Sequence, residues 1–545
     1  MAARSNRTAL LAWLLLAGLL AIRIPSLVQP AGADQALYAY VGQRILAGDV
    51  PYRDAWDQKP PAIHVTYAAL IALWPHESVV AGADLVVAAL TALSLIALGR
   101  RLSPYPGAGT AAAALFLLLA NPAFGRLGGV RVRAQCEVFI ALAIAASLLS
   151  AWKATMLRRG REARADSAGR GWLVTAGALV GIAALFKYNA VVYGIPVAAL
   201  ALRRADGTSR LELSKDAGAL IAGAIVPVGV MLSWMAGAGA LKDLVYATID
   251  YNLLYSGETY PSRAAMLLYL MTFPIRQARL DSLWFLGGLG SAVLIAMGLW
   301  SFRRRETGAG GTLLLVAPLW VAAACLAIAI NGSRGLPQYF LQANAPLALA
   351  AGIAAAWCWP RMRPLWRTLT AVLLAIAVLR IANFEKVADA TAYDLAHMRG
   401  EINRRQYLSR FGRADSGDKY SAEAVADLAS YLREHTRPTD RSLVFGFSPW
   451  SLVGSGRASA SRFFWSRPVI IGFKDDETGY GAAGLIGELD RHQPPLIVLQ
   501  ERDWDPDGPN SADFFLANDR LASWLHERYE SAGRLHNFQL WRRRP

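Results

Sequence analysis

Apolar segments of about the length that a bilayer requires recur along the first 384 residues, and short charged stretches separate them. A helix needs about 20 apolar residues to cross the hydrocarbon core of a membrane. On this basis we predict about eleven spans. They lie near residues 9–28, 79–99, 108–122, 135–152, 172–186, 189–202, 216–235, 282–302, 312–330, 339–357 and 367–384. The pattern therefore predicts a polytopic α-helical membrane protein.

After Phe384 the pattern changes to charged segments with short apolar runs. Helical spacing predicts helices, and short β-branched or apolar runs predict strands. The expected helices lie at Asp394–Arg410, Ala422–Glu434 and Leu521–Tyr529, and the expected strands at Ser442–Phe445, Val469–Ile471 and Pro495–Leu499. We therefore predict a transmembrane module over residues 1–384 with an outer first loop at 29–78, followed by a soluble α/β domain at 385–545.

The formal net charge of +16 lies mainly in short basic runs at the ends of apolar segments. These runs are Arg100-Arg101, Arg158-Arg159, Arg203-Arg204, Arg303-Arg304-Arg305 and the stretch from Arg361 to Arg367. Cytoplasmic loops of membrane proteins are enriched in Lys and Arg, so the runs predict a cytoplasmic N-terminus. This placement argues against nucleic acid as a partner. An odd number of spans then places residues 385–545 outside.

Two apolar segments near the N-terminus affect the number of predicted spans. Ala9–Val28 is longer than the usual core of a signal peptide, so we predict a retained first helix, with cleavage after Ala33 as the alternative. Ile63–Trp74 is too short for a span, and counting it would reverse the charge pattern downstream. We expect it to re-enter the membrane or to lie along its surface. The three cysteines, Cys136, Cys325 and Cys358, form neither a disulfide framework nor a CxxC metal site.

The first outer loop contains an unusually dense set of charges for a connector, at Asp34, Arg44, Asp49, Arg53, Asp54, Asp57 and Lys59. Apolar residues between Ala36 and Ala47 recur near helical spacing, which predicts an amphipathic helix along the membrane surface. Asp34 lies near the start of this helix, where backbone N–H groups stabilise a carboxylate.

Further charges lie on the same predicted outer side: Arg131, Arg133, Glu137, Lys187 and Arg334. Lys187 lies between two apolar segments, so it needs an anionic partner unless its side chain extends to the headgroups. Positive charge is disfavoured on this side, and phosphate is the natural partner of such cations. We infer that Lys59, Lys187 and Arg334 hold an anionic, lipid-borne substrate. Asp34 can then take a proton from an acceptor, and a sugar linked to a lipid phosphate supplies an activated leaving group without ATP.

The stretch YAYVGQRILAGDVPYRDAWDQKPP after an acidic residue, and SRGLPQYFLQANAPLALAAG at 333–352, carry a family resemblance. The chain resembles the GT-C glycosyltransferases of the protein O-mannosyltransferase and aminoarabinose transferase superfamily. The resemblance implies a polyprenyl-phosphate-linked sugar as donor, transfer with inversion on the periplasmic side of a bacterial inner membrane, and a glycan, lipid or protein acceptor. It also implies that Asp34 is the catalytic acidic residue and that Lys59 meets the lipid phosphate.

The chain departs from the family pattern at two positions. The family often has an Asp-Glu pair where this chain has Asp34-Gln35, and often a His where it has Gln338, beside Tyr339. Glutamine can bind a sugar hydroxyl but ligates a divalent cation less well, so no metal or other cofactor is indicated. The residues expected to bind substrate are Gln35, Asp54, Asp57, Lys59, Arg133, Glu137, Lys187, Arg334, Gln338 and Tyr339.

Two other classes of function stay open. A flippase or transporter for lipid-linked sugars would carry polar groups near the middle of its spans, whereas the predicted spans are largely free of charge. A structural or sensing protein led by residues 385–545 would leave the membrane half inert. We see no Gly-rich nucleotide-binding loop and no internal repeat of fixed period.

Overall fold

The structure, a computed structural model, describes residues 2–124, 129–158, 163–203, 209–257, 259–303, 313–414, 420–504 and 508–545. Arg159, Arg204, Arg304 and Arg305, named above for their charge, lie outside these residues. Backbone contacts divide the chain into two compact units. The first contains residues 1–27, 81–234 and 254–392, and the second contains residues 28–80, 235–253 and 393–545.

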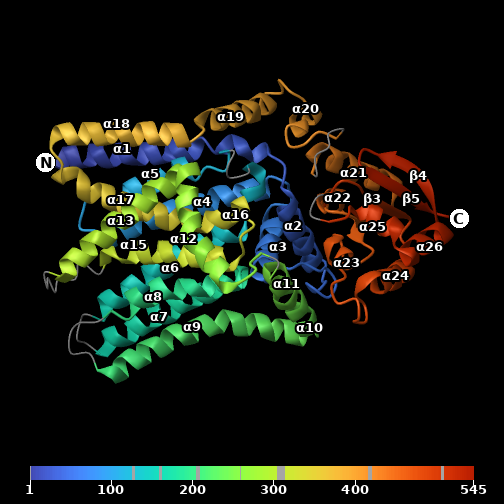
Figure 1. Ribbon diagram of the computed structural model, residues 1–545, viewed down its shortest axis with the longest axis horizontal. Helices are drawn as coiled ribbons and strands as arrows, with labels where there is room; N and C mark the ends of the chain where they lie inside the picture. The colour runs from blue at the N-terminus through green and yellow to red at the C-terminus, as the bar shows by residue number, and fades with distance from the viewer. Residues whose placement is uncertain are drawn as a thin grey trace. The chain divides into compact units, whose positions relative to one another are not determined.

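The first unit is built from helices, which run from blue to yellow in Figure 1. In chain order its elements are α1 (Ala2–Ala21), η1 (Ile24–Val28), α4 (Val79–Leu102), α5 (Ala108–Leu119), η3 (Gly129–Val132), α6 (Cys136–Leu157), α7 (Ala163–Phe186), η4 (Tyr188–Tyr193), α8 (Gly194–Ala201), α9 (Arg210–Gly237), α11 (Tyr251–Gly257), α12 (Arg263–Leu280), α13 (Ser282–Arg303), α15 (Val316–Ile330), α16 (Pro337–Phe340), η6 (Leu341–Ala343), α17 (Asn344–Arg361), α18 (Pro364–Ile381) and α19 (Phe384–Met398). A few of these, such as α11 and α19, continue into the second unit.

Eight helical segments of the described chain are long and apolar enough to cross a membrane. They are Leu10–Val28, Val79–Leu102, Cys136–Leu157, Ser167–Phe186, Arg210–Gly237, Ser282–Ser301, Pro337–Arg361 and Pro364–Ile381. Each coincides with a predicted span. The other three predicted spans coincide with shorter apolar helices, Ala108–Leu119, Tyr188–Ala201 and Val316–Ile330. The predicted fold class, a polytopic helical membrane protein with a small C-terminal sheet, is confirmed.

Small residues let the helices of the first unit approach closely. A Cβ atom at Gly177 on α7 would collide with the Leu220 carbonyl on α9, and one at Gly352 on α17 would collide with Ala112 on α5. Lipid tails are as apolar as leucine, so helices in a membrane associate mainly through such close van der Waals packing. The glycines therefore fix which helices pair.

The second unit combines helices with a five-stranded sheet. Its elements are α2 (Ala33–Leu46), α3 (Ala62–Leu73), α10 (Leu241–Val245), the π-helix η5 (Tyr246–Asp250), α20 (Arg404–Ser409), α21 (Ala422–His435), β1 (Arg441–Phe445), α22 (Trp450–Ser455), β2 (Ala458–Ser459), α23 (Arg467–Ile470), α24 (Gly481–His492), β3 (Leu496–Gln500), α25 (Ser511–Ala517), α26 (Asp519–Arg528), β4 (Tyr529–Leu535) and β5 (Phe538–Arg543). The strand order is β2-β1-β3-β5-β4, with β1 parallel to β2 and β3, and β5 antiparallel to β3 and β4. Figure 1 labels β3, β4 and β5.

Two expectations for the C-terminal residues are wrong. The predicted strand at Val469–Ile471 lies in and after the short helix α23, because Pro468 begins a helical turn and three apolar residues do not distinguish a strand from a helix. The single helix expected over Asp394–Arg410 is two helices, α19 and α20, separated at Gly400, which has a φ of 76°. The hairpin of β4 and β5 was not predicted, because its outward-facing residues are largely charged.

The first-loop helix is present as α2, and its position along the membrane surface stays a prediction. The eight consecutive residues from Gln35 to Gly42 are all buried, so this part of α2 is covered on every side. It packs against α3 and α22. The spacing of the apolar residues correctly predicts a helix. However, Gln35, Tyr38 and Gly42, which lie outside that apolar pattern, are buried as well.

Gly42 allows α2 and α3 to cross closely, and this contact yields a prediction. A Cβ at Gly42 would lie 2.8 Å from the Ala68 nitrogen and 3.0 Å from the Tyr67 carbonyl carbon. We expect Gly42→Val to lower the free energy of unfolding by about 1–3 kcal/mol, the usual cost of overpacking, measured by thermal melting in detergent. Gly229→Ala on α9, where nothing lies within 4 Å, is the control. An unchanged melting temperature for Gly42→Val would contradict the close crossing.

Candidate active site

The predicted site residues fall into two groups, one in each unit. Asp34, Gln35, Asp54, Asp57 and Lys59 belong to the second unit, and Arg133, Glu137, Lys187, Arg334, Gln338 and Tyr339 belong to the first.

Asp34 lies in the first turn of α2 and its side chain is half-buried. The N-terminus of a helix carries unpaired N–H groups and a partial positive charge, which stabilise an ionised carboxylate. The neighbouring Gln35 is fully buried. The sequence thus places a carboxylate in the first turn of the helix that follows the first apolar segment.

Asp54 is held at the turn that follows α2. It accepts hydrogen bonds from the Val50 N–H at 2.8 Å and from Arg53, whose Nη2 lies 2.7 Å from Oδ2. Burial raises the pKa of Asp54, but the hydrogen bonds from Arg53 and Val50 outweigh it and lower the pKa below its ordinary value. The Asp54 carboxylate therefore stabilises the turn in which it lies.

Asp57 is fully buried and lies beside a residue that the sequence analysis did not select. Its Oδ2 lies 2.8 Å from Nε2 of His64, which is also fully buried. Lys59, two residues further on, is half-buried, and its carbonyl accepts a hydrogen bond from the Tyr52 hydroxyl at 2.8 Å. A histidine in the otherwise apolar segment after Lys59 was the signal that could have identified the partner of Asp57.

In the first unit, Glu137, Lys187 and Tyr339 come together. The Lys187 Nζ lies 2.6 Å from Glu137 Oε1 and 4.7 Å from the centre of the Tyr339 ring, and both charged side chains are buried. Glu137 occupies the first turn of α6, where the helix dipole also favours its charge. The expectation that Lys187 needs an anionic partner is confirmed. Gln338 lies next to Tyr339 in the short helix α16 and is half-buried.

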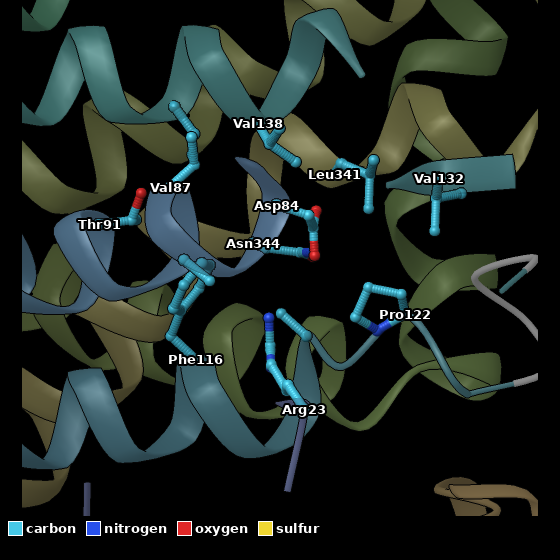
Figure 2. A pocket seen from close by; sticks show the side chains of 13 residues that line it. Arg23, Asp84, Val87, Thr91, Phe116, Pro122, Val132, Val138, Leu341 and Asn344 are labelled. Atoms are coloured by element: carbon cyan, nitrogen blue, oxygen red, sulfur yellow. The ribbon is translucent and has the colours of Figure 1, made fainter. Parts of the chain in front are cut away.

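Arg133 pairs with Asp84, whose Oδ2 lies 3.6 Å away, and both are buried. Asp84 also accepts a hydrogen bond from the Ala134 N–H at 3.2 Å. Figure 2 shows Asp84, Arg23 and Asn344 around a cavity of about 30 Å³ with mainly apolar walls. Arg23 and Asp84 were not predicted as site residues. The signal that could have identified them is a charge inside or at the end of a predicted span.

Arg334 is exposed and stacks on an aromatic ring. Its guanidinium carbon lies 3.9 Å from the centre of the Tyr255 ring. Stacking restricts the orientation of the guanidinium. Among the described residues, no group of three or more His, Cys, Asp or Glu side chains is arranged to hold a metal ion.

Comparison with known proteins finds the same architecture in solved membrane enzymes. ArnT from Cupriavidus metallidurans matches with a TM-score of 0.55 and 18% identity, covering 99% of this chain and 98% of ArnT. ArnT bound to undecaprenyl phosphate matches with a TM-score of 0.56 and 16% identity, covering 97% of each chain. The chain has the GT-C fold.

A second match extends the GT-C fold to an archaeal protein. The Archaeoglobus fulgidus oligosaccharyltransferase AglB, in complex with an inhibitory peptide and a dolichol-phosphate, has a TM-score of 0.54 and 13% identity over 98% of this chain and 74% of AglB. No protein-family model and no curated protein sequence matches the chain. The GT-C fold is thus shared at low sequence identity, and the predicted resemblance to this fold is confirmed.

The ion pair of Glu137 and Lys187 yields a stability prediction. We expect Glu137→Ala to lower the free energy of unfolding by about 3–5 kcal/mol, because it leaves a buried ammonium without a counter-charge. Replacing both residues by methionine should recover most of this loss, since a buried ion pair and an apolar pair of similar volume have similar net stability. Thermal melting in detergent measures both effects. Equal losses in the single and double variants would contradict the pair's role.

Proposed function

We propose that the chain is a membrane glycosyltransferase that moves a sugar from a polyprenyl-phosphate donor to an acceptor on the periplasmic face. The observation that carries this proposal is the likeness of nearly the whole chain to ArnT, in a structure that holds undecaprenyl phosphate. The GT-C architecture of AglB, which holds a dolichol-phosphate in its structure, supports a lipid-linked donor in general.

In the proposed reaction, Asp34 is the general base. It takes the proton from the hydroxyl or amine of the acceptor as that atom attacks the anomeric carbon of the donor sugar. The bond between this carbon and the phosphate oxygen breaks on the opposite side of the sugar, so the configuration inverts. The electron pair of that bond leaves with the polyprenyl phosphate.

The cations Lys59, Lys187 and Arg334 are proposed to bind the donor phosphate and to stabilise the negative charge that grows on it as it leaves. Gln35, Asp54, Arg133, Glu137, Gln338 and Tyr339 are proposed to orient the donor sugar and the acceptor. Residues 385–545 are proposed to influence the choice of acceptor, which is a glycan, a lipid or a protein.

Asp34→Asn tests the base assignment. The amide keeps the shape of the side chain but cannot accept the proton, so transfer should fall by about 10²–10⁴-fold. The assay uses purified protein in detergent, a radiolabelled polyprenyl-phosphate sugar and a cell-envelope extract as acceptor, and undecaprenyl phosphate binding serves as the control for folding. Detergent removes the two compartments, so transfer by the wild type also excludes a function limited to transport. Near-native turnover by Asp34→Asn would overturn the base assignment.

The proposed topology places the N-terminus in the cytoplasm and residues 385–545 in the periplasm of a bacterial inner membrane. An alkaline phosphatase reporter, which is active only outside the cytoplasm, should therefore be active when fused after residue 400. A fusion after Arg203, in the predicted cytoplasmic loop, should be inactive and serves as the matched control. Activity of the Arg203 fusion alone would reverse the orientation.

A further inference from the structure

The turn from Trp56 to Lys59 is fixed through its backbone by residues far away in the sequence. The Trp56 N–H donates to the Arg462 carbonyl at 2.9 Å, and the Trp465 indole Nε1 donates to the Trp56 carbonyl at 3.0 Å. The Trp56 side chain is itself fully buried. The entrance of the turn is therefore locked from the C-terminal part of the second unit.

The exit of the same turn is held just as firmly. The Asn252 side-chain Nδ2 donates to the Gln58 carbonyl at 2.7 Å, and the Tyr52 hydroxyl donates to the Lys59 carbonyl at 2.8 Å. The Gln58 and Lys59 carbonyls, which lie on either side of the Lys59 Cα, thus both accept hydrogen bonds from side chains of the same unit. Lys59 extends its ammonium from a backbone that cannot shift independently.

Asp57 and His64 form the buried centre of this arrangement. Asp57 Oδ1 accepts from the Gln58 N–H at 2.8 Å, while Oδ2 lies 2.8 Å from His64 Nε2. The rings of Tyr52 and Tyr38 lie edge-on to the imidazole, at 5.8 Å and 6.2 Å between centres, and restrict its rotation. Neither Asp57 nor His64 is exposed, and both carboxylate oxygens of Asp57 are engaged within the turn.

We propose that Asp57 and His64 are positioning residues that hold the Lys59 ammonium where it meets the phosphate of the lipid donor. This inference rests on the proposed function of Lys59. The His64 imidazole contacts Oδ2 of the Asp57 carboxylate, and Oδ1 of the same carboxylate accepts a hydrogen bond from the Gln58 N–H. These contacts fix the turn, and the turn orients Lys59. A group held in its bound geometry loses less conformational entropy on binding, so the network increases affinity without touching the ligand.

The test measures binding of undecaprenyl phosphate to the full-length protein in detergent. Lys59→Ala should weaken binding about tenfold, the factor that corresponds to 1.4 kcal/mol. His64→Phe leaves Asp57 Oδ2 without its donor and should weaken binding to a similar extent. His64→Gln, whose amide can donate to Asp57, should restore most of the affinity. Leu428→Ala, which alters a buried leucine of α21 away from the turn, controls for general loss of stability.

The double variant His64→Phe/Lys59→Ala separates positioning from a merely structural effect. If His64 acts through Lys59, the double variant binds no more weakly than Lys59→Ala alone, because the two changes remove one interaction. Additive losses, or unchanged binding in His64→Phe, would overturn the positioning role while leaving the proposed function intact. Unchanged binding in Lys59→Ala would overturn the proposed role of Lys59 itself.

Asn252→Ala gives a second route should His64→Phe fail to fold. It removes the hydrogen bonds that the side chain donates to the Gln58 and Thr248 carbonyls, and it leaves the buried pair in place. We expect binding to weaken about threefold, which corresponds to roughly half of the 1.4 kcal/mol of a tenfold change, with no further loss in the Lys59→Ala background. Equal loss in both backgrounds would contradict the inference.

Discussion

Charge buried away from water must be matched by charge of opposite sign or by hydrogen bonds, and this requirement organises the molecule. Lys187 is matched by Glu137, and Arg133 by Asp84. Near the other end of α6, Arg158 meets Asp216 on α9 at 2.5 Å. Each pair joins segments far apart in the sequence, so the pairs restrict how the helices can be assembled.

The hydropathy pattern was sufficient to predict the membrane part, because eight long apolar segments are long enough to be recognised one at a time. The carboxylate-bearing α2 was also found from its spacing. The pattern could not show that this part of α2 is covered on all sides, because Gln35 and Gly42 are buried by helices whose identity depends on the tertiary fold. Similarly, β4 and β5 are adjacent strands, and their exposed charged residues interrupt the alternation of apolar and polar positions that would predict a strand.

For the candidate site, the sequence identified the residues but only some of their partners. A buried lysine between apolar segments required an anion, and Glu137 is that anion. Asp57 was predicted to bind substrate, and the contacts that the sequence did not show are those with His64 and the Gln58 N–H. A single sequence shows that Asp57 is charged but not that it is fully enclosed. Burial of this kind is a property of the tertiary structure.

The second unit is completed by contacts that span almost the whole chain. The Tyr40 hydroxyl accepts a hydrogen bond from the Ser459 N–H across 419 positions, and Trp465 reaches Trp56 across 409. At a synthesis rate of about 5–20 residues per second, roughly 20–80 seconds pass between the emergence of the two sides of these contacts. During that interval α2 is made but lacks α22, its later packing partner. The stretch that bears Asp34 and Lys59 therefore acquires its final environment only at the end of biosynthesis.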